Sequence, residues 1–173
     1  MFKVIGRLDG AHYAIKRTER KLQSEREKNE ALKEVQAMAS LGSGNDHIVR
    51  YFGAWMEYDH LYIQLELCET SLGGIVQQSM QSGGSQGVPG GGLGSQGADR
   101  RFTAFGEREV TEVLRHVGAA LACAHERNVA HLDVKPDNIL VLRGVYKLAD
   151  WGRAAPVDGA GGGVSVEDGR SSS

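Results

Sequence analysis

The uneven placement of glycine limits most strongly how this chain can fold. Of its 24 glycines, eight lie between positions 82 and 98, and six lie between positions 152 and 173. A stretch so rich in Gly, Ser and Gln cannot bury enough apolar surface to become ordered, so residues 82–98 are predicted to form a flexible surface loop. The rest of the 173 residues has an ordinary globular composition and suffices for one hydrophobic core, but hardly for two.

Charge and cysteine content argue against several functions. The 20 Lys and Arg residues against 22 Asp and Glu leave a net charge of −2, so no basic excess is available for a nucleic acid or an anionic membrane. Cys68 and Cys123 lack the spacing of a zinc site or a disulfide scaffold. The longest apolar run, 117–124, is far shorter than the about 20 residues that cross a bilayer, and no apolar leader follows Met1. We therefore expect an intracellular protein, nuclear or cytoplasmic.

Hydrophobic periodicity predicts an antiparallel hairpin and then a helix at the start of the chain. Extended-type runs at 2–8 and 12–17 flank Asp9 and Gly10, a pair that suits a tight turn. From Ser24 to Gly42, a capping-box pattern precedes apolar residues at helical spacing, and the glycine ends them.

Strands and helices continue to alternate along the rest of the chain. A short helix is predicted at 71–78 and a longer one at 107–127, whose apolar face is to contain Val110, Val113, Leu114, Val117, Leu121 and Ala124. Four short strands are predicted, at 48–55, 60–67, 139–142 and 145–148. This order of elements indicates an α+β fold.

Two polar motifs near the end of the chain carry the chemistry. The sequence H-L-D-V-K-P-D-N spans 131–138, and D-W-G follows at 150–152. Magnesium prefers hard oxygen ligands, and the acceptor hydroxyl of a phosphoryl transfer needs a carboxylate to orient it. We therefore predict that Asn138 and Asp150 hold magnesium and that Asp133 accepts the proton.

These motifs resemble the catalytic loop and the D-F-G motif of protein kinases, and Y-A-I-K at 13–16 resembles their V-A-I-K strand. The resemblance implies a protein-kinase-like fold with a small β-rich lobe and hinge, residues 1–70, followed by the start of a helical large lobe, 71–155. It also implies ATP and Mg²⁺ as cofactors and a protein hydroxyl as the acceptor. Since the family's glycine-rich phosphate loop would precede this sequence and its A-P-E region would follow it, we expect a kinase domain truncated at both ends, with a flexible partial activation segment at 156–173.

The resemblance also implies roles for two lysines and an acid. Lys16 would contact the α- and β-phosphates, Lys135 would steady the transferred group, and an acid of the first helix would order Lys16. We choose Glu34, because it borders the apolar stripe and no lysine or arginine lies three or four residues away from it, whereas Glu30 has such neighbours. A solvated helix acid remains the alternative for Glu34.

The adenine site is implied by the resemblance alone. The segment 65–68 would be the hinge that binds adenine through its backbone, with Ala14 and Leu140 enclosing the ring. The complete implied nucleotide-binding set is Ala14, Lys16, Leu65, Glu66, Cys68, Asn138, Leu140 and Asp150. From the sequence alone, a place in the core is the better explanation for each of the three aliphatic residues of this set.

Finer motifs resemble the Wee-type mitotic-inhibitor kinases: R-L-D-G at 7–10, Y-A-I-K-R at 13–17 and V-R-Y-F-G-A-W at 49–55. This likeness implies inhibitory tyrosine phosphorylation of a cyclin-dependent kinase in cell-cycle control. The eukaryotic initiation-factor kinases share a similar Y-F-x-A-W segment, so a relative of those kinases stays open. A non-catalytic kinase remnant that acts as a binding module also stays open.

The sequence departs from the family pattern at two positions. Leu132 replaces the arginine of H-R-D, which is expected to leave no cation beside the catalytic loop for a phosphorylated activation segment. Trp151 replaces the phenylalanine of D-F-G and is expected to pack as an apolar wedge beneath the helix of Glu34, while His131 is expected to be a packed structural histidine. Because later large-lobe helices would be missing, the helix at 107–127 is expected to expose side chains such as Val113, Leu114, Val117 and Leu121, and the chain to aggregate or need a partner.

Overall fold

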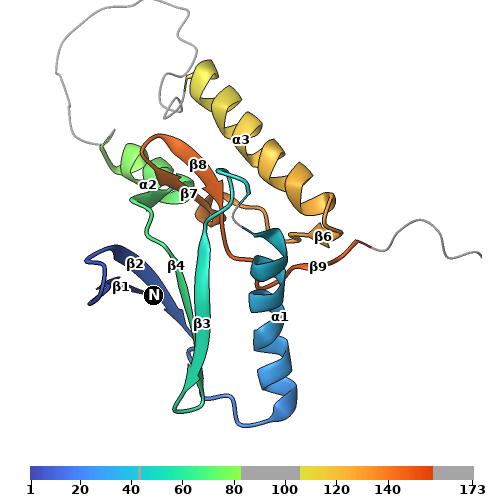
Figure 1. The fold of residues 1–173 in the computed structure, drawn as a ribbon. Coiled ribbons are helices and arrows are strands. Elements are labelled where there is room, and N and C mark those ends of the chain that lie inside the picture. Colours follow the sequence, from blue (N-terminus) through green and yellow to red (C-terminus); the bar gives the residue numbers. More distant parts are fainter. Residues whose placement is uncertain (43, 83–105, 158–173) are drawn as a thin grey trace, which may run out of the picture.

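The computed structural model describes residues 1–42, 44–82 and 106–157 (Figure 1). A four-stranded antiparallel sheet with one helix beside it forms the first part, and two helices with short strands form the second. The elements, in chain order, are β1 (Phe2–Ile5), β2 (His12–Arg17), α1 (Glu25–Leu41), β3 (Tyr51–Glu57), β4 (His60–Glu66), β5 (Thr70–Ser71), α2 (Leu72–Ser82), α3 (Glu107–His125), β6 (Val129–Ala130), a 3-10 turn (Pro136–Asn138), β7 (Ile139–Leu142), β8 (Val145–Leu148) and β9 (Ala155–Pro156).

The predicted hairpin at the start of the chain is confirmed, but its first strand is shorter than expected. Strand β1 ends at Ile5 rather than at residue 8, because the Gly6 amide donates to the Ala11 carbonyl at 2.8 Å and closes a loop there. Gly10 adopts a φ of 68°, in the left-handed region that glycine tolerates without strain. The sheet then continues in the order β1-β2-β4-β3, which makes β3 an edge strand.

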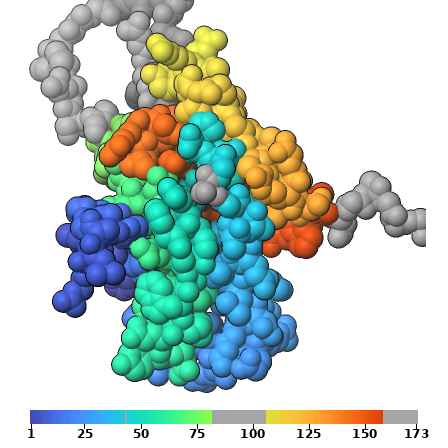
Figure 2. All heavy atoms as spheres, viewed as in Figure 1, coloured from blue at the N-terminus to red at the C-terminus, as the bar shows by residue number. Residues whose placement is uncertain are grey.

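Helix α1 forms as its capping pattern predicts. The Ser24 hydroxyl accepts a hydrogen bond from the Glu27 amide at 3.2 Å, the Glu27 carboxylate accepts one from the Ser24 amide at 2.9 Å, and Gly42 caps the other end with a φ of 63°. Met38 and Leu41 are buried on its inner face. The helix lies alongside β3, while the β1–β2 hairpin forms the opposite edge of the same part (Figure 2).

The second part is built around a small sheet in the order β5-β7-β8, with α3 packed against β8. The predicted strands 139–142 and 145–148 are confirmed, and they turn at Arg143 and Gly144, which both have positive φ. The two-residue strands β6 and β9 pair antiparallel and were not predicted, because two residues carry no periodicity. One cluster of buried apolar side chains spans both parts, from Ala14 to Trp151.

The predicted apolar face of α3 is only partly correct. Val117 and Ala124 are buried, but Val110 is 46% exposed and Leu114 is 68% exposed. His116 is buried instead, since its ring stacks on the His47 ring at a centroid distance of 4.1 Å and its Nδ1 accepts the Tyr146 amide hydrogen at 3.2 Å. Because its ring nitrogen is hydrogen-bonded and its ring is stacked, this histidine packs against β8 as an apolar residue would. The expectation that missing large-lobe helices would leave side chains of this helix exposed is thus confirmed for Leu114 and wrong for Val117.

The segments expected to be flexible, 82–98 and 156–173, lie outside the described residues apart from Ser82, Pro156 and Val157. Among the residues that are described, no helix is long and apolar enough to cross a membrane.

Candidate active site

Three ionisable groups from distant parts of the chain meet between the two parts of the fold. The Lys16 ammonium, on β2, lies 2.7 Å from a carboxylate oxygen of Glu34 on α1 and 2.7 Å from one of Asp150, which follows β8. Glu34 is the more enclosed of the two acids, with a side chain that is 13% exposed against 45% for Asp150. The pair of Lys16 with Glu34 that local charge predicted is therefore present.

The pKa values of Lys16 and Asp150 favour the charged forms of these two groups. Burial by itself would lower the pKa of Lys16, but the charge of Glu34 and the hydrogen bonds to Asp150 and Glu34 outweigh it, so the net pKa is raised. Burial would raise the pKa of Asp150, yet the hydrogen bond and the charge from Lys16 lower it overall. Lys16 is therefore a cation, and Asp150 an anion, across the physiological range.

The predicted catalytic aspartate lies at the centre of a second cluster. One carboxylate oxygen of Asp133 accepts from the Lys135 ammonium at 2.7 Å and from the Asn138 amide at 3.0 Å, and Arg153 approaches the other oxygen at 3.6 Å. These interactions, the Lys135 hydrogen bond above all, lower the pKa of Asp133. Sequence reasoning missed Arg153, so the expectation that Leu132 leaves no cation beside this loop is wrong.

His131 holds the two motifs together. Its side chain is fully buried, its Nδ1 accepts the Asp133 amide hydrogen at 3.2 Å, and its Nε2 lies 2.9 Å from the Ala149 carbonyl. Since Nδ1 is an acceptor, the proton must be on Nε2, which donates to that carbonyl. The ring meets Trp151 edge to face at a centroid distance of 4.5 Å. The expected structural role of His131 is confirmed.

Trp151 is 1% exposed and belongs to the same buried cluster as Met38 and Leu41 of α1. It therefore packs as the apolar wedge that was expected. Its indole Nε1 is buried without a hydrogen-bond partner in the described part of the chain. Asp150, next to it, has a φ of 63°, an uncommon backbone conformation for a residue other than glycine.

The first cluster and Asn138 of the second line one cavity of about 380 Å³, whereas Asp133, Lys135 and Arg153 are not among its lining residues. All eight residues of the implied nucleotide-binding set line it, together with Glu34: Ala14, Lys16, Leu65, Glu66, Cys68, Asn138, Leu140 and Asp150. Cys68 lines the cavity, and its backbone amide makes no hydrogen bond to any other described residue. An unpaired donor of this kind calls for a ligand or water partner. Whether these side chains bind nucleotide stays a prediction.

Two of the lining residues fit a divalent cation. Both hydrogen bonds of the Asn138 side chain, to the Asp133 carbonyl and to its carboxylate, use the amide nitrogen, so the amide oxygen remains for a metal. Asp150 adds a carboxylate, and the bond between the Ala149 amide and the Asn138 carbonyl, 2.9 Å long, keeps the two segments adjacent. One amide and one carboxylate oxygen make a partial set of the kind that Mg²⁺ completes with phosphate oxygens and water. The described residues contain no cluster of three or more His, Cys, Asp or Glu that could hold a metal.

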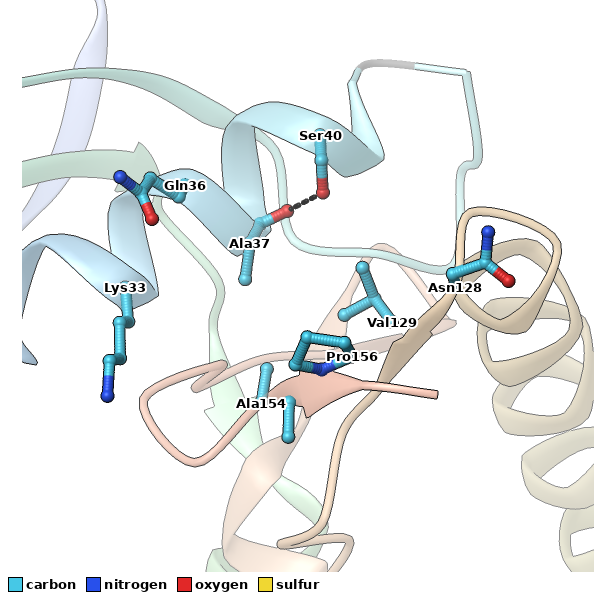
Figure 3. Close-up of a pocket in the computed structure, with 9 residues that line it drawn as sticks. Lys33, Gln36, Ala37, Ser40, Asn128, Val129, Ala154 and Pro156 are labelled. Carbon is cyan, nitrogen blue, oxygen red and sulfur yellow. Dashed lines mark hydrogen bonds between the residues drawn. The ribbon is translucent and has the colours of Figure 1, made fainter. Parts of the chain in front are cut away.

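A second cavity of about 380 Å³ lies between α1 and the β6–β9 ladder (Figure 3). Lys33, Gln36, Ala37 and Ser40 of α1 form one wall, and Val129, Ala154 and Pro156 lie on the other side. Lys33 is its only ionisable lining residue within the described chain. A cavity without carboxylates or paired cations offers little for phosphoryl transfer, so we assign the chemistry to the first cavity.

Cys68 should react slowly with thiol reagents despite its place in the cavity. Burial, reinforced by the negative charge of Glu66, raises the pKa of its thiol to about 11, and only the thiolate is nucleophilic. At pH 7.5 we expect iodoacetamide to label Cys68 at least about tenfold more slowly than a free cysteine of ordinary pKa. Mass spectrometry of timed digests measures this. Labelling of Cys68 at the rate of free cysteine would contradict the assigned environment.

Comparison with known proteins agrees with this geometry. The model of the protein kinase domain family matches residues 1–166. A Wee1-like protein kinase from Oryza sativa subsp. japonica is 40% identical over 171 residues, and one from Arabidopsis thaliana is 38% identical over 169 residues. Wee1-like protein kinase 2 from Xenopus tropicalis is 37% identical over 143 residues.

These matches cover 99%, 98% and 83% of the chain, respectively. The chain spans only 27%, 29% and 22% of the lengths of those three relatives. The likeness to the Wee-type kinases that the motifs predicted is confirmed by these identities. The chain belongs to the protein kinase domain family.

Proposed function

We propose that this chain provides the nucleotide-binding and catalytic-loop part of a Wee-type kinase, which transfers the γ-phosphoryl group of ATP to a tyrosine hydroxyl of a cyclin-dependent kinase in cell-cycle control. The observation that carries this proposal is the meeting of Lys16, Glu34 and Asp150 in a cavity that is also lined by Asn138, the hydrogen-bond partner of Asp133. The names of the relatives support the Wee type. In this role the protein would work in the nucleus or the cytoplasm.

Each charged group has a task in this reaction. Lys16, kept in place by Glu34, binds the α- and β-phosphates, and Lys135 neutralises charge on the transferred group. Asn138 and Asp150 would hold Mg²⁺, which supplies positive charge at the phosphates when it is bound. Lys16 bonds only the Oδ1 oxygen of Asp150, so the Oδ2 oxygen remains for the cation.

Asp133 acts mainly by orientation. Its lowered pKa makes it a weak base, and its carboxylate is held by Lys135 and Asn138 at a defined position. An acceptor hydroxyl that donates to this carboxylate is aligned with the phosphorus, and its proton can pass to Asp133 as the new bond forms. The protein thus supplies position and charge compensation rather than strong basicity.

Aliphatic side chains and the backbone of Cys68 lie together in one part of the cavity. Ala14 and Leu65 come from adjacent strands, where they are register partners, and Leu140 comes from β7. We assign the purine to the space between them, with the Cys68 amide as its hydrogen-bond donor. An apolar slot with a single polar contact suits a flat heterocycle.

Nucleotide binding by the whole 173-residue chain tests the assignment of the cavity. Isothermal titration calorimetry with MgATP should show at least about tenfold weaker binding to Lys16→Ala than to the unaltered chain, because a charge-assisted contact to phosphate is lost. Asp150→Ala should abolish the gain in affinity that Mg²⁺ provides over ATP alone.

The control for this titration is Lys28→Ala, which removes an exposed lysine that pairs with Glu25 on α1, and it should bind like the unaltered chain. Equal MgATP affinity in all four proteins would remove the assignment. Binding that survives both active-site changes would place the nucleotide elsewhere.

A further inference from the structure

A second ion pair joins the two parts of the fold at the adenine end of the cavity. The Lys147 ammonium, on β8, lies 3.1 Å from a carboxylate oxygen of Glu66 at the end of β4. The Lys147 side chain is 10% exposed and that of Glu66 is 21% exposed, so both charges are largely removed from water. Burying charged groups to this extent is costly unless they are paired.

The Glu66 carboxylate ties three segments together. The oxygen that faces Lys147 also accepts the Arg50 amide hydrogen at 3.2 Å, and the Glu66 amide donates to the Arg50 carbonyl at 2.9 Å. The end of β4 is thus fixed both to the segment that enters β3 and to β8 of the β5-β7-β8 sheet. Two residues further along, Cys68 lines the cavity, and its backbone amide has no partner among the described residues.

Lys147 is in turn tied to the opposite wall of the cavity. Its register partner on β7 is Leu140, and directly opposed residues of an antiparallel pair share one face of the sheet. Leu140 lines the cavity from that face. The ion pair therefore links the strand that carries Leu140 to the chain that carries the Cys68 amide.

The ion pair of Glu66 and Lys147 differs from that of Lys16 and Asp150 in what ligand binding requires of it. These are the two ion pairs that join residues 1–66 to the later part of the chain among the described residues. Lys16 is the register partner of Ile63, three residues before Glu66, which separates the two pairs by about 10 Å along β4. Lys16 and Asp150 have tasks at the phosphates and the cation, whereas the proposed reaction gives the side chains of Glu66 and Lys147 no task there.

We propose that the ion pair of Glu66 and Lys147 is a positioning element that sets the separation between the Cys68 amide and Leu140, and thereby the affinity for the adenosine moiety. This inference rests on the proposed function, because it takes the cavity to bind a nucleotide. Neither residue touches the reacting phosphates, so both act through the backbone and the wall that they hold. Their loss should weaken recognition of adenosine and leave recognition of the phosphates unchanged.

Titrations of the 173-residue chain with three probes test this separation of roles: adenosine, MgATP and magnesium tripolyphosphate. In Lys147→Met and in Glu66→Gln, the affinities for adenosine and for MgATP should fall by the same factor, about five- to tenfold, while that for tripolyphosphate stays the same. The Glu66→Gln/Lys147→Met double variant should lose no more than either single variant, since all three lack the same ion pair. Lys147→Arg keeps the charge and should keep the affinity.

Lys28→Met is the matched control, because it removes a lysine from the exposed 2.9 Å pair with Glu25 and should change nothing. Circular dichroism verifies that each variant is folded. If a single variant does not fold because an unpaired charge is buried, the neutral double variant decides.

The outcomes separate the two proposals. Unaltered adenosine affinity in the folded double variant, tighter binding, or an equal loss for tripolyphosphate would overturn the positioning role, while the proposed function would stand. Failure of the unaltered chain to bind both adenosine and MgATP would overturn the proposed function and this inference with it.

Discussion

Replacing Asp133 by asparagine should lower the rate of phosphoryl transfer by about 10²- to 10⁴-fold while leaving MgATP affinity within about twofold. Asparagine keeps the size of the side chain, but it cannot accept the hydroxyl proton, and its amide would face the donors of Lys135 and Asn138 that now converge on the carboxylate. The measurement is transfer of labelled phosphate from ATP to a cyclin-dependent kinase bound to its cyclin. Analysis of the phosphorylated amino acid identifies the acceptor, which should be tyrosine.

Asp59→Asn is the control for this loss. Asp59 lies in the turn between β3 and β4 with a φ of 65°, a conformation that asparagine tolerates, and its nearest cation, Lys21, is 4.0 Å away. This variant should keep full activity. An Asp133→Asn protein that transfers phosphate at the unaltered rate would contradict the assigned role of Asp133, and labelling confined to serine or threonine would contradict the proposed tyrosine specificity.

Replacing Trp151 by alanine should lower the free energy of unfolding by about 3–5 kcal/mol, a large share of the stability of an ordinary domain. Trp151 is the largest side chain that is less than 2% exposed, and its removal would leave a cavity beneath α1 and beside His131. Urea denaturation followed by circular dichroism measures the change. Since Asp150 and Gly152 flank this tryptophan, MgATP binding should also weaken in the part of the population that stays folded.

The chain's other tryptophan is a matched control. Trp55 is 41% exposed and stacks on Tyr62 at a ring distance of 5.3 Å, so Trp55→Ala should cost only about 0.5–1.5 kcal/mol. Trp151→Phe should cost less than Trp151→Ala, because phenylalanine fills much of the space and removes the buried indole N–H that has no partner. Equal losses for Trp55→Ala and Trp151→Ala would mean that Trp151 is not the core wedge described.

The parts of the site that could be predicted are those with a local signature. Glu34 could be chosen from the sequence because no lysine or arginine lies three or four residues away from it, and a helix acid without a local partner next to an apolar stripe has to find one elsewhere. The structure pairs it with Lys16, 18 residues away. The catalytic loop and D-W-G are each an unbroken stretch of sequence. Their residues and their order along the chain were therefore sufficient to predict a shared role.

Other contacts could not be predicted because they depend on how distant segments pack. Nothing near Glu66 in the sequence points to Lys147, which lies 81 residues later and becomes its partner only when β8 packs beneath the end of β4. From the sequence, Arg153 looks like an ordinary surface cation. Its proximity to Asp133 depends on the turn that follows D-W-G. The burial of His116 depends in the same way on stacking with His47 and on a bond from the backbone of β8.

The assignment of the nucleotide and metal site can be tested with a crystal of the chain soaked with Mn²⁺ and a non-hydrolysable ATP analogue. Adenine should lie between Ala14 and Leu140, phosphate oxygens should contact the Lys16 ammonium, and an anomalous Mn²⁺ peak should lie at Asn138 and Asp150. Nucleotide density beside Lys33 in the cavity between α1 and the β6–β9 ladder, or an Mn²⁺ peak away from both Asn138 and Asp150, would contradict it.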